Sequence, residues 1–327
     1  MDIAILSVYN ANSGVCAMSR YFVVNPKSGS GHGKKIWDRT EAYLKSIHAE
    51  YEVYFTTGRG DAERKIRELT EEKHFTDGSS LIVIGGDGTN NEAINGFDLE
   101  SGMLFGFIPG GSGNDLSRSL GVENETIEHT ASMIEGNRTL DLDVGVLRLP
   151  DGKQRKFLVS AGISFDAAVC EHLERSRFKK LCAKMGCASL SYGIVGFMEY
   201  LKTKLLPCSV TDAEGKKYDF ESTFFVSFQV HPFEGGGFKF APAARWNDGK
   251  LEVCVTHAAP RIKLAPVILG GKGEKGLLPG PVVSFVSTEH AAVSFPEELY
   301  VHTDGEVQGK YKSLETDCLR GKLRMII

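Results

Sequence analysis

The chain has 327 residues, of which 42% are hydrophobic and 24% are charged, and its formal net charge at pH 7 is −4. This composition is ordinary for a globular protein and excludes a disordered chain. The charge gives no support for wholesale binding to nucleic acid, and no apolar run approaches the ~20 residues that span a bilayer. The length predicts two domains, and any membrane contact is expected to be peripheral.

Residues 18–138 are predicted to form the first domain, because an apolar segment, a glycine-rich turn and an amphipathic helix follow one another four times. The apolar segments are 21–24, 51–55, 81–84 and 104–108. Such alternation is typical of βαβ units, which form a mostly parallel sheet with its turns at one carboxyl edge. We therefore predict an α/β nucleotide-binding domain. Residues 1–17 precede this pattern, and we expect them to be a dispensable extension.

From residue 139 onward the pattern changes to short apolar segments separated by turns. Most of these segments read as β-strands, and only 166–185 and 189–204 look helical. Many strands with turn signals predict an all-β domain, a sandwich or barrel of antiparallel strands, over 139–311. The last segment, 312–327, is expected to return to the first domain, with the ligand cleft between the two domains.

The glycine-rich turns are the first candidates for chemistry. Glycine-rich loops at helix starts offer backbone N–H groups to phosphates, and the helix dipole adds positive potential. The loop Gly85-Gly86-Asp87-Gly88-Thr89 carries a carboxylate that would repel a bare phosphate. Asp87 therefore predicts a divalent cation between itself and the phosphates. The alternative is that Asp87 only caps the following helix.

Three motifs in this order resemble the catalytic family of diacylglycerol kinases, which includes bacterial lipid kinases, sphingosine kinases and ceramide kinases. They are Asn25-Pro26-Lys27-Ser28-Gly29, Gly85-Gly86-Asp87-Gly88-Thr89-Asn90-Asn91-Glu92 and Gly111-Ser112-Gly113-Asn114-Asp115. Later landmarks of the family are matched by Gly235-Gly236-Gly237, Ala241-Pro242, Asp248-Gly249-Lys250-Leu251 and Asp304-Gly305-Glu306. The resemblance implies an ATP-dependent kinase that phosphorylates a lipid hydroxyl.

By this resemblance, one group of residues would surround ATP: Asn25, Pro26, Lys27, Ser28, Gly29, Thr56, Gly85, Gly86, Asp87, Gly88, Thr89, Asn90, Asn91, Glu92, Ser112, Asn114 and Asp115. Asp87 would act towards Mg²⁺. Asp304, helped by Glu306, would take the proton of the lipid hydroxyl, since an alcohol is a poor nucleophile without a positioned base. The alternative for Asp304-Gly305 is a plain turn between two strands.

The resemblance further implies a structural Mg²⁺ at Asp248, completed by backbone carbonyls near Arg245 and Lys250. A plain turn is the alternative there. Diacylglycerol is the expected acceptor, giving phosphatidic acid, while a sphingoid base, another acylglycerol or a polyprenol stays open. The family often has one asparagine near the position of Ser160 and another near that of His231, and this chain has neither. The difference affects the prediction of the lipid acceptor more than that of the phosphate donor.

Segment 173–185 mixes five cations with apolar residues, which predicts transient contact of a cytoplasmic protein with the inner face of the membrane. A solvated charged helix face is the alternative. Two other functions compete with a lipid kinase. A kinase similar to NAD kinases shares the Gly-Gly-Asp-Gly loop, and a nucleotide-binding regulator would lack catalysis. The oligomeric state stays open, with a homodimer as one option.

Overall fold

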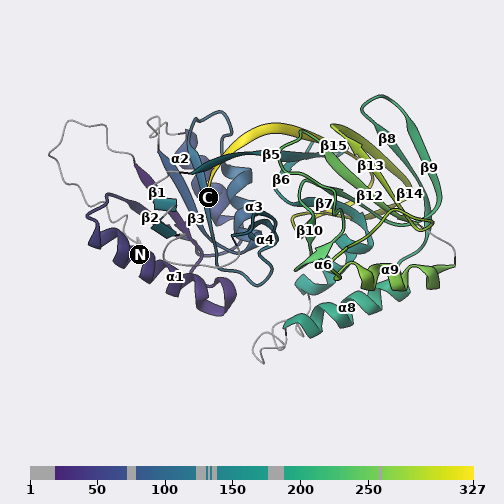
Figure 1. Ribbon diagram of the computed structural model, residues 1–327, viewed down its shortest axis with the longest axis horizontal. Coiled ribbons are helices and arrows are strands. Elements are labelled where there is room, and N and C mark those ends of the chain that lie inside the picture. Colours follow the sequence, from purple (N-terminus) through teal and green to yellow (C-terminus); the bar gives the residue numbers. More distant parts are fainter. Residues whose placement is uncertain are drawn as a thin grey trace. The chain divides into compact units, whose positions relative to one another are not determined.

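The computed structural model describes residues 19–71, 79–122, 130–131, 133–134, 138–175, 188–257 and 260–327 (Figure 1). The chain divides into two compact units. Unit 1 comprises Met1–Leu142 with Gly321–Ile327, and unit 2 comprises Asp143–Arg320. The predicted boundaries, 138/139 and 311/312, precede the positions where the two units change, 142/143 and 320/321. The expected extension, residues 1–17, lies outside the described residues.

Unit 1 alternates strands and helices, as the glycine-rich pattern predicted. Its elements are β1 (Arg20–Val24), α1 (Ser28–Ser46), β2 (Glu52–Phe55), α2 (Asp61–Glu71), β3 (Ser80–Gly85), α3 (Asp87–Gly96), β4 (Leu104–Pro109) and α4 (Asp115–Leu120). The strands are parallel in the order β2-β1-β3-β4, and the end of β15 (Glu306–Ile326) extends this sheet beside β4.

Both faces of the unit 1 sheet are covered. Ile82 and Ile84 of β3 pack in one core with Trp37 of α1. Leu81 and Val83 point to the opposite face, because side chains alternate along a strand, and they are equally buried. This burial explains why the strands read as continuous apolar runs, which is typical of parallel sheets with helices on both sides.

Unit 2 is built mainly from antiparallel strands. Its elements are β5 (Thr139–Arg148), shared with unit 1, β6 (Gln154–Phe157), β7 (Ser160–Ser164), α6 (Phe165–Arg175), α8 (Ala188–Lys202), β8 (Leu206–Asp212), β9 (Lys217–Gln229), β10 (Phe233–Glu234), β11 (Phe238–Lys239), β12 (Leu251–His257), η1 (Arg261–Lys263), α9 (Ala265–Gly270), β13 (Val283–Thr288), β14 (His290–Thr303) and most of β15. The two predicted helices correspond to α6 and α8, although residues 176–187 lie outside the described part. Helix α9 and the length of β15 were not predicted from the sequence.

The long strands β9 and β14 give unit 2 its sandwich character. One part of each strand pairs with β7 and another part pairs with β8, so the four strands form a closed circuit of pairings. A large core that includes Phe157, Val226 and Val293 fills the space these strands enclose. The predicted fold class, an α/β unit followed by a β-sandwich-like unit, is confirmed. Among the described residues, no helix combines the length and apolar character needed to cross a membrane.

Candidate nucleotide and catalytic sites

Three glycine-rich loops of unit 1 meet at one edge of its sheet. They follow β1, β3 and β4, which are parallel neighbours and therefore end side by side. The first two loops are joined by Asn25, whose Nδ2 donates to Thr89 Oγ1 at 2.9 Å. Asn25 Oδ1 also accepts the N–H of Lys27 at 3.0 Å. Residues 29–31 have left-handed backbone angles, so the regular part of α1 begins after them.

The second and third loops approach so closely that glycine is required at the contact. A Cβ atom on Gly111 would lie 2.6 Å from Gly86 Cα, and one on Gly113 would lie 2.5 Å from Asp87 Oδ2. Any larger residue would have to push the loops apart. The glycines predicted to cradle phosphates thus also allow the two loops to pack against each other.

Asp87 connects these two loops. It is the first residue of α3, and its Oδ2 accepts the N–H of Asn114 at 2.8 Å. Asn114 is left-handed, with φ 53°, and its side chain bonds both the N–H and the carbonyl of Gly111. Gly86 occupies the N-cap of α3, so Asp87 is not the N-cap residue of this helix. The role of Asp87 towards Mg²⁺ stays a prediction.

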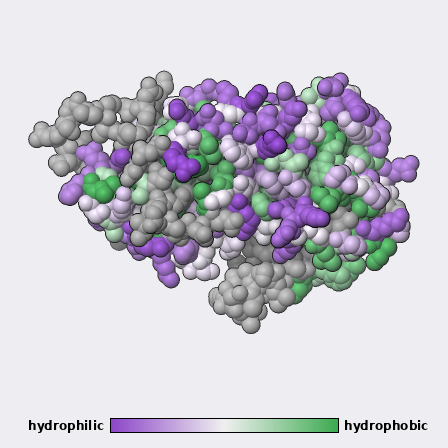
Figure 2. Space-filling view, viewed as in Figure 1, coloured by the Kyte–Doolittle hydropathy of each residue, from purple (hydrophilic) through white to green (hydrophobic). Residues whose placement is uncertain are grey.

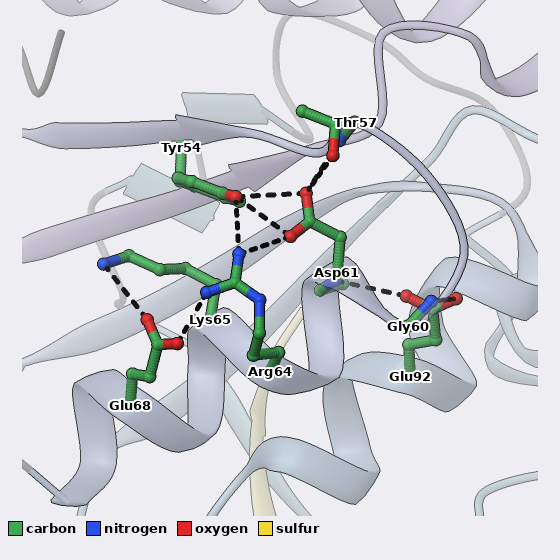
Figure 3. A network of polar contacts seen from close by, with 9 residues as sticks. Tyr54, Thr57, Gly60, Asp61, Arg64, Lys65, Glu68 and Glu92 are labelled. Atoms are coloured by element: carbon green, nitrogen blue, oxygen red, sulfur yellow. Dashed lines mark hydrogen bonds and ion pairs between the residues drawn. The ribbon is translucent and has the colours of Figure 1, made fainter. Parts of the chain in front are cut away.

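Glu92, predicted to lie beside ATP, contacts the neighbouring loop. Its Oε1 accepts the N–H of Gly60 at 2.7 Å and its Oε2 accepts that of Ala62 at 3.2 Å (Figure 3). Both N–H groups belong to the start of α2, where a carboxylate is stabilised by the helix dipole. Glu92 therefore positions the start of α2.

Asp61 is the centre of the network in Figure 3. Its carboxylate accepts the N–H and the hydroxyl of Thr57 at 2.8 and 2.9 Å and pairs with Arg64 at 2.6 Å. Burial raises the pKa of Asp61, but the hydrogen bonds from Thr57 and Arg64 outweigh it and lower the pKa to about 2. This network fixes the loop that follows β2.

The remaining predicted ATP residues of unit 1 lie in or next to these loops. Thr56 donates its N–H to Val24 at the end of β1, at 2.9 Å, and this places it beside the Asn25 loop. Asp115 is buried and pairs with Arg118 at 2.7 Å. The others lie in the loops or in the ends of the adjoining elements, and Asn90 and Asn91 of α3 are buried: Pro26, Lys27, Ser28, Gly29, Gly85, Gly88, Asn90, Asn91 and Ser112.

In unit 2, Asp304 and Gly305 form the two-residue turn between β14 and β15, with φ angles of 47° and 84°. The plain-turn alternative therefore describes the backbone of these two residues correctly. The Asp304 carboxylate also accepts three backbone N–H groups, from Leu158 at 3.0 Å, Val159 at 2.8 Å and Ser160 at 3.0 Å. These donors orient the carboxylate and stabilise its negative charge. Glu306 is half-buried at the start of β15.

The Asp248 turn has a second carboxylate beside it. Asp248 Oδ1 accepts the N–H of Lys250 at 3.0 Å, and the buried Asp143 accepts the N–H of Gly249 at 2.7 Å through Oδ2. Burial and the negative charges of Asp143 and Asp248 raise the pKa of the Cys318 thiol, which places both carboxylates near it. Asp143 and Asp248 both bind N–H groups of this turn, and two carboxylates fit a hard divalent cation better than Asp248 alone.

Arg245 and Lys250 carry exposed cationic side chains, so only their carbonyl oxygens suit such a cation. Sequence reasoning did not include Asp143, because it falls in a strand-like segment with no ligand motif.

Sequence reasoning also missed a buried cluster formed by Asp166, Glu234 and His302. His302 Nε2 lies 3.3 Å from Asp166 Oδ2 and 3.3 Å from Glu234 Oε1. Burial, with a contribution from the charge of Glu234, raises the pKa of the Asp166 carboxyl. The only signal in the sequence was proximity: Glu234 directly precedes the Gly235-Gly236-Gly237 motif, and His302 lies two residues before Asp304.

Two family models match most of the chain. Residues 19–147 match the family described as the diacylglycerol kinase catalytic domain. Residues 158–327 match the YegS C-terminal domain, described as similar to the β-sandwich of NAD kinases. The chain is 26% identical over 292 residues to a diacylglycerol kinase of Bacillus subtilis, covering 88% of this chain and 89% of that protein.

Two further relatives extend this comparison. YtlR of Bacillus subtilis, by its name a candidate lipid kinase, is 25% identical over 296 residues, covering 88% of this chain and 93% of that protein. A crystal structure of a candidate diacylglycerol kinase from Bacillus anthracis shares the fold, with a TM-score of 0.72, 24% identity and coverage of 95% and 98%. Because the family matches span nearly all of the described chain, this protein belongs to the diacylglycerol kinase family of phosphotransferases.

Proposed function

We propose that the protein is an ATP-dependent lipid kinase that transfers the γ-phosphoryl group to a lipid hydroxyl, with diacylglycerol as the first acceptor to test. The proposal that ATP is the phosphate donor rests on the meeting of three glycine-rich loops. The hydrogen bonds Asn25–Thr89 and Asp87–Asn114 hold these loops together. The acceptor half is supported by the relatives, one of which is named a diacylglycerol kinase.

In this proposal the phosphates of ATP bind the backbone N–H groups of the loops at 85–89 and 110–114. Asp87 is the residue that would hold Mg²⁺, which would neutralise charge on the phosphate oxygens. Asp304 would take the proton of the lipid hydroxyl as the phosphorus–oxygen bond forms. Its three N–H donors would fix the direction of the carboxylate, with Glu306 as its helper.

The test is an ATP-dependent phosphorylation screen over diacylglycerol, other acylglycerols, sphingoid bases, polyprenols and NAD. Phosphorylation of one or more lipids is expected, and transfer to NAD alone would contradict the proposal. Asp304→Asn is expected to abolish turnover while ATP binding is retained, because ATP binds in unit 1. A non-catalytic regulator would show no turnover with any acceptor and little response to Asp304→Asn.

We further propose that unit 2 contacts the cytoplasmic face of the membrane transiently through an apolar surface on α8, η1 and α9. Most of the segment predicted for this role, 173–185, lies outside the described residues. The next helix, α8, exposes an apolar stripe at helical spacing, with exposed fractions of 40, 63, 47 and 56% for Ile194, Phe197, Met198 and Leu201. Ile262 and Leu269 are 72 and 77% exposed on η1 and α9.

These elements are joined, since Tyr200 of α8 donates its hydroxyl hydrogen bond to the Arg261 carbonyl at 2.8 Å. Figure 2 shows hydrophobic residues gathered on this lower edge of unit 2. The exposed cations Lys202 and Lys263 directly follow Leu201 and Ile262 in the chain, and Lys202 also pairs with Glu199 at 3.5 Å. An apolar surface flanked by cations fits anionic phospholipid headgroups, where each cation contributes about 1 kcal/mol.

Sedimentation with phosphatidylglycerol vesicles tests this surface. The double variant Phe197→Ser with Leu201→Ser is expected to reduce vesicle binding several-fold, while Ile47→Ser is the control. Ile47 is 43% exposed but lies in unit 1, far along the chain from α8. Equal binding of the double variant and the control would refute the proposal.

A further inference from the structure

The inference concerns His302, which is completely buried two residues before Asp304. In the sheet of unit 2, His302 of β14 lies opposite Gly162 of β7, and Gly162 lies opposite Ser227 of β9. These three residues form one row across the strands, so their side-chain positions share one face. A Cβ atom on Gly162 would overlap the Asp166 carboxylate. Glycine at 162 therefore makes room for the contact between His302 and Asp166.

The two carboxylates beside His302 come from separate elements, α6 and β10 (Figure 1). Each is held by further donors. Asp166 Oδ1 accepts the N–H of Ala167 at 2.7 Å, and Glu234 Oε2 accepts the Ser227 hydroxyl at 3.0 Å and the amide of Gln229. Both carboxylates are thus fixed, and both leave one oxygen directed at His302 Nε2.

Two carboxylates and an imidazole also resemble a metal site, but the other ring nitrogen argues against one. His302 Nδ1 lies 3.1 Å from the backbone nitrogen of Gly305. Burial lowers the pKa of His302, and the contacts with Asp166 and Glu234 raise it further than burial lowers it. A second proton on Nδ1 would nevertheless face the Gly305 N–H, which can only donate, so Nδ1 accepts and the ring proton is on Nε2. A metal on Nε2 would move that proton to Nδ1, against the Gly305 N–H. The cluster is therefore a chain of hydrogen bonds from the carboxylates through the imidazole to Gly305.

We propose that His302 is a positioning residue that holds the Asp304-Gly305 turn in its reactive conformation. The inference rests on the proposed function, in which Asp304 takes the proton of the acceptor hydroxyl. Both turn residues have left-handed angles, and the N–H of Gly305 has no strand partner in the ladder between β14 and β15. The buried carboxylates fix the ring, and the ring fixes that N–H. Asp304 is then held through its carboxylate, by three N–H donors, and through the next residue, Gly305, by His302.

Two substitutions separate this role from simple packing. An asparagine oxygen reaches the position of Nδ1, so His302→Asn keeps an acceptor for the Gly305 N–H and loses the contact with the carboxylates. A glutamine nitrogen reaches the position of Nε2, so His302→Gln keeps a donor for the carboxylates and loses the acceptor. Both remove the ring, but only His302→Asn leaves the two buried carboxylates without this donor, so the melting temperature of each variant is measured beside its kcat.

With diacylglycerol as acceptor, His302→Gln is expected to lower kcat about 10- to 100-fold, with the KM for ATP unchanged. His302→Asn is expected to retain most of kcat although its melting temperature is the lower of the two, because the buried carboxylates lose their donor. Equal losses in the two variants, or a greater loss in His302→Asn, would overturn the inference.

Amide hydrogen exchange at Gly305 provides a readout that does not depend on activity. Exchange is expected to be slow in the unchanged protein and in His302→Asn, and at least about tenfold faster in His302→Gln. If no lipid is phosphorylated, the proposed function fails, and the exchange experiment alone decides whether His302 holds the turn. Fast exchange at Gly305 in the unchanged protein would refute the contact itself.

Discussion

The three hydrogen bonds to Asp304 predict how strongly this residue stabilises unit 2. In Asp304→Ala, the N–H groups of Leu158, Val159 and Ser160 lose a charged acceptor at 2.8 to 3.0 Å. A hydrogen bond to a charged group contributes about 1.5–3 kcal/mol, but these three share one partner and are only part-buried, so about 3 kcal/mol in total is expected. Alanine in a left-handed conformation adds about 1 kcal/mol.

The expected loss for Asp304→Ala is therefore about 3–4 kcal/mol, equivalent to a melting temperature about 10 °C lower. Asp304→Asn keeps one acceptor oxygen and tolerates the left-handed backbone, so it is expected to lose only about 1–2 kcal/mol. Urea denaturation followed by circular dichroism measures both values.

A separate variant isolates the backbone contribution. His48 is exposed and also left-handed, with φ 53°, so His48→Ala measures the conformational cost without any carboxylate. The reasoning is wrong if Asp304→Ala destabilises no more than His48→Ala, or if the Asn and Ala variants are equally destabilised.

Two further predictions concern unit 1. The folded pKa of Asp61, about 2, lies below its unfolded value near 3.9, so its ionised form stabilises the fold above pH ~4 and this contribution is lost as the pH falls towards 2. Asp61→Asn should therefore destabilise by about 2 kcal/mol at pH 7 and by less at pH 3, and a constant difference in urea denaturation would contradict this. Gly113→Ala should weaken ATP binding at least about tenfold, because its Cβ displaces the Asp87 carboxylate. Gly58→Ala is the control for calorimetric ATP binding, since a Cβ there meets no atom within 4 Å; equal affinities would contradict the role of the close approach.

The meeting of the glycine-rich loops was predictable because turn chemistry is local in the sequence. Glycines, Asp87 and Asn114 lie in short turns, and turn chemistry reports backbone geometry without knowledge of the fold. The parallel sheet then brings the turns together by the rule that its strand ends share an edge. Asp87 was assigned to a cation from residue type alone, and its hydrogen bond to Asn114 joins two loops that the sequence treated separately.

The partners of charged residues were not predictable in the same way. The Glu92 carboxylate accepts the N–H groups of Gly60 and Ala62, which lie at the start of α2. Asp304 depends on N–H groups near residue 159, and these become neighbours only when β14 pairs with β7. Such contacts are set by sheet register over a long separation, and a pattern read along one segment carries no information about register.

One strand links the completion of unit 1 to the synthesis of unit 2. The end of β15 supplies Leu323, Met325 and Ile326, all buried, and Met325 pairs with Phe105 of β4. On the ribosome, these residues emerge only after all of unit 2 has been made. While residues 143–320 are being translated, the edge of β4 that later pairs with the end of β15 is still unpaired with it. We expect a nascent unit 1 to depend on chaperones, and the kinase to mature only when its last strand is in place.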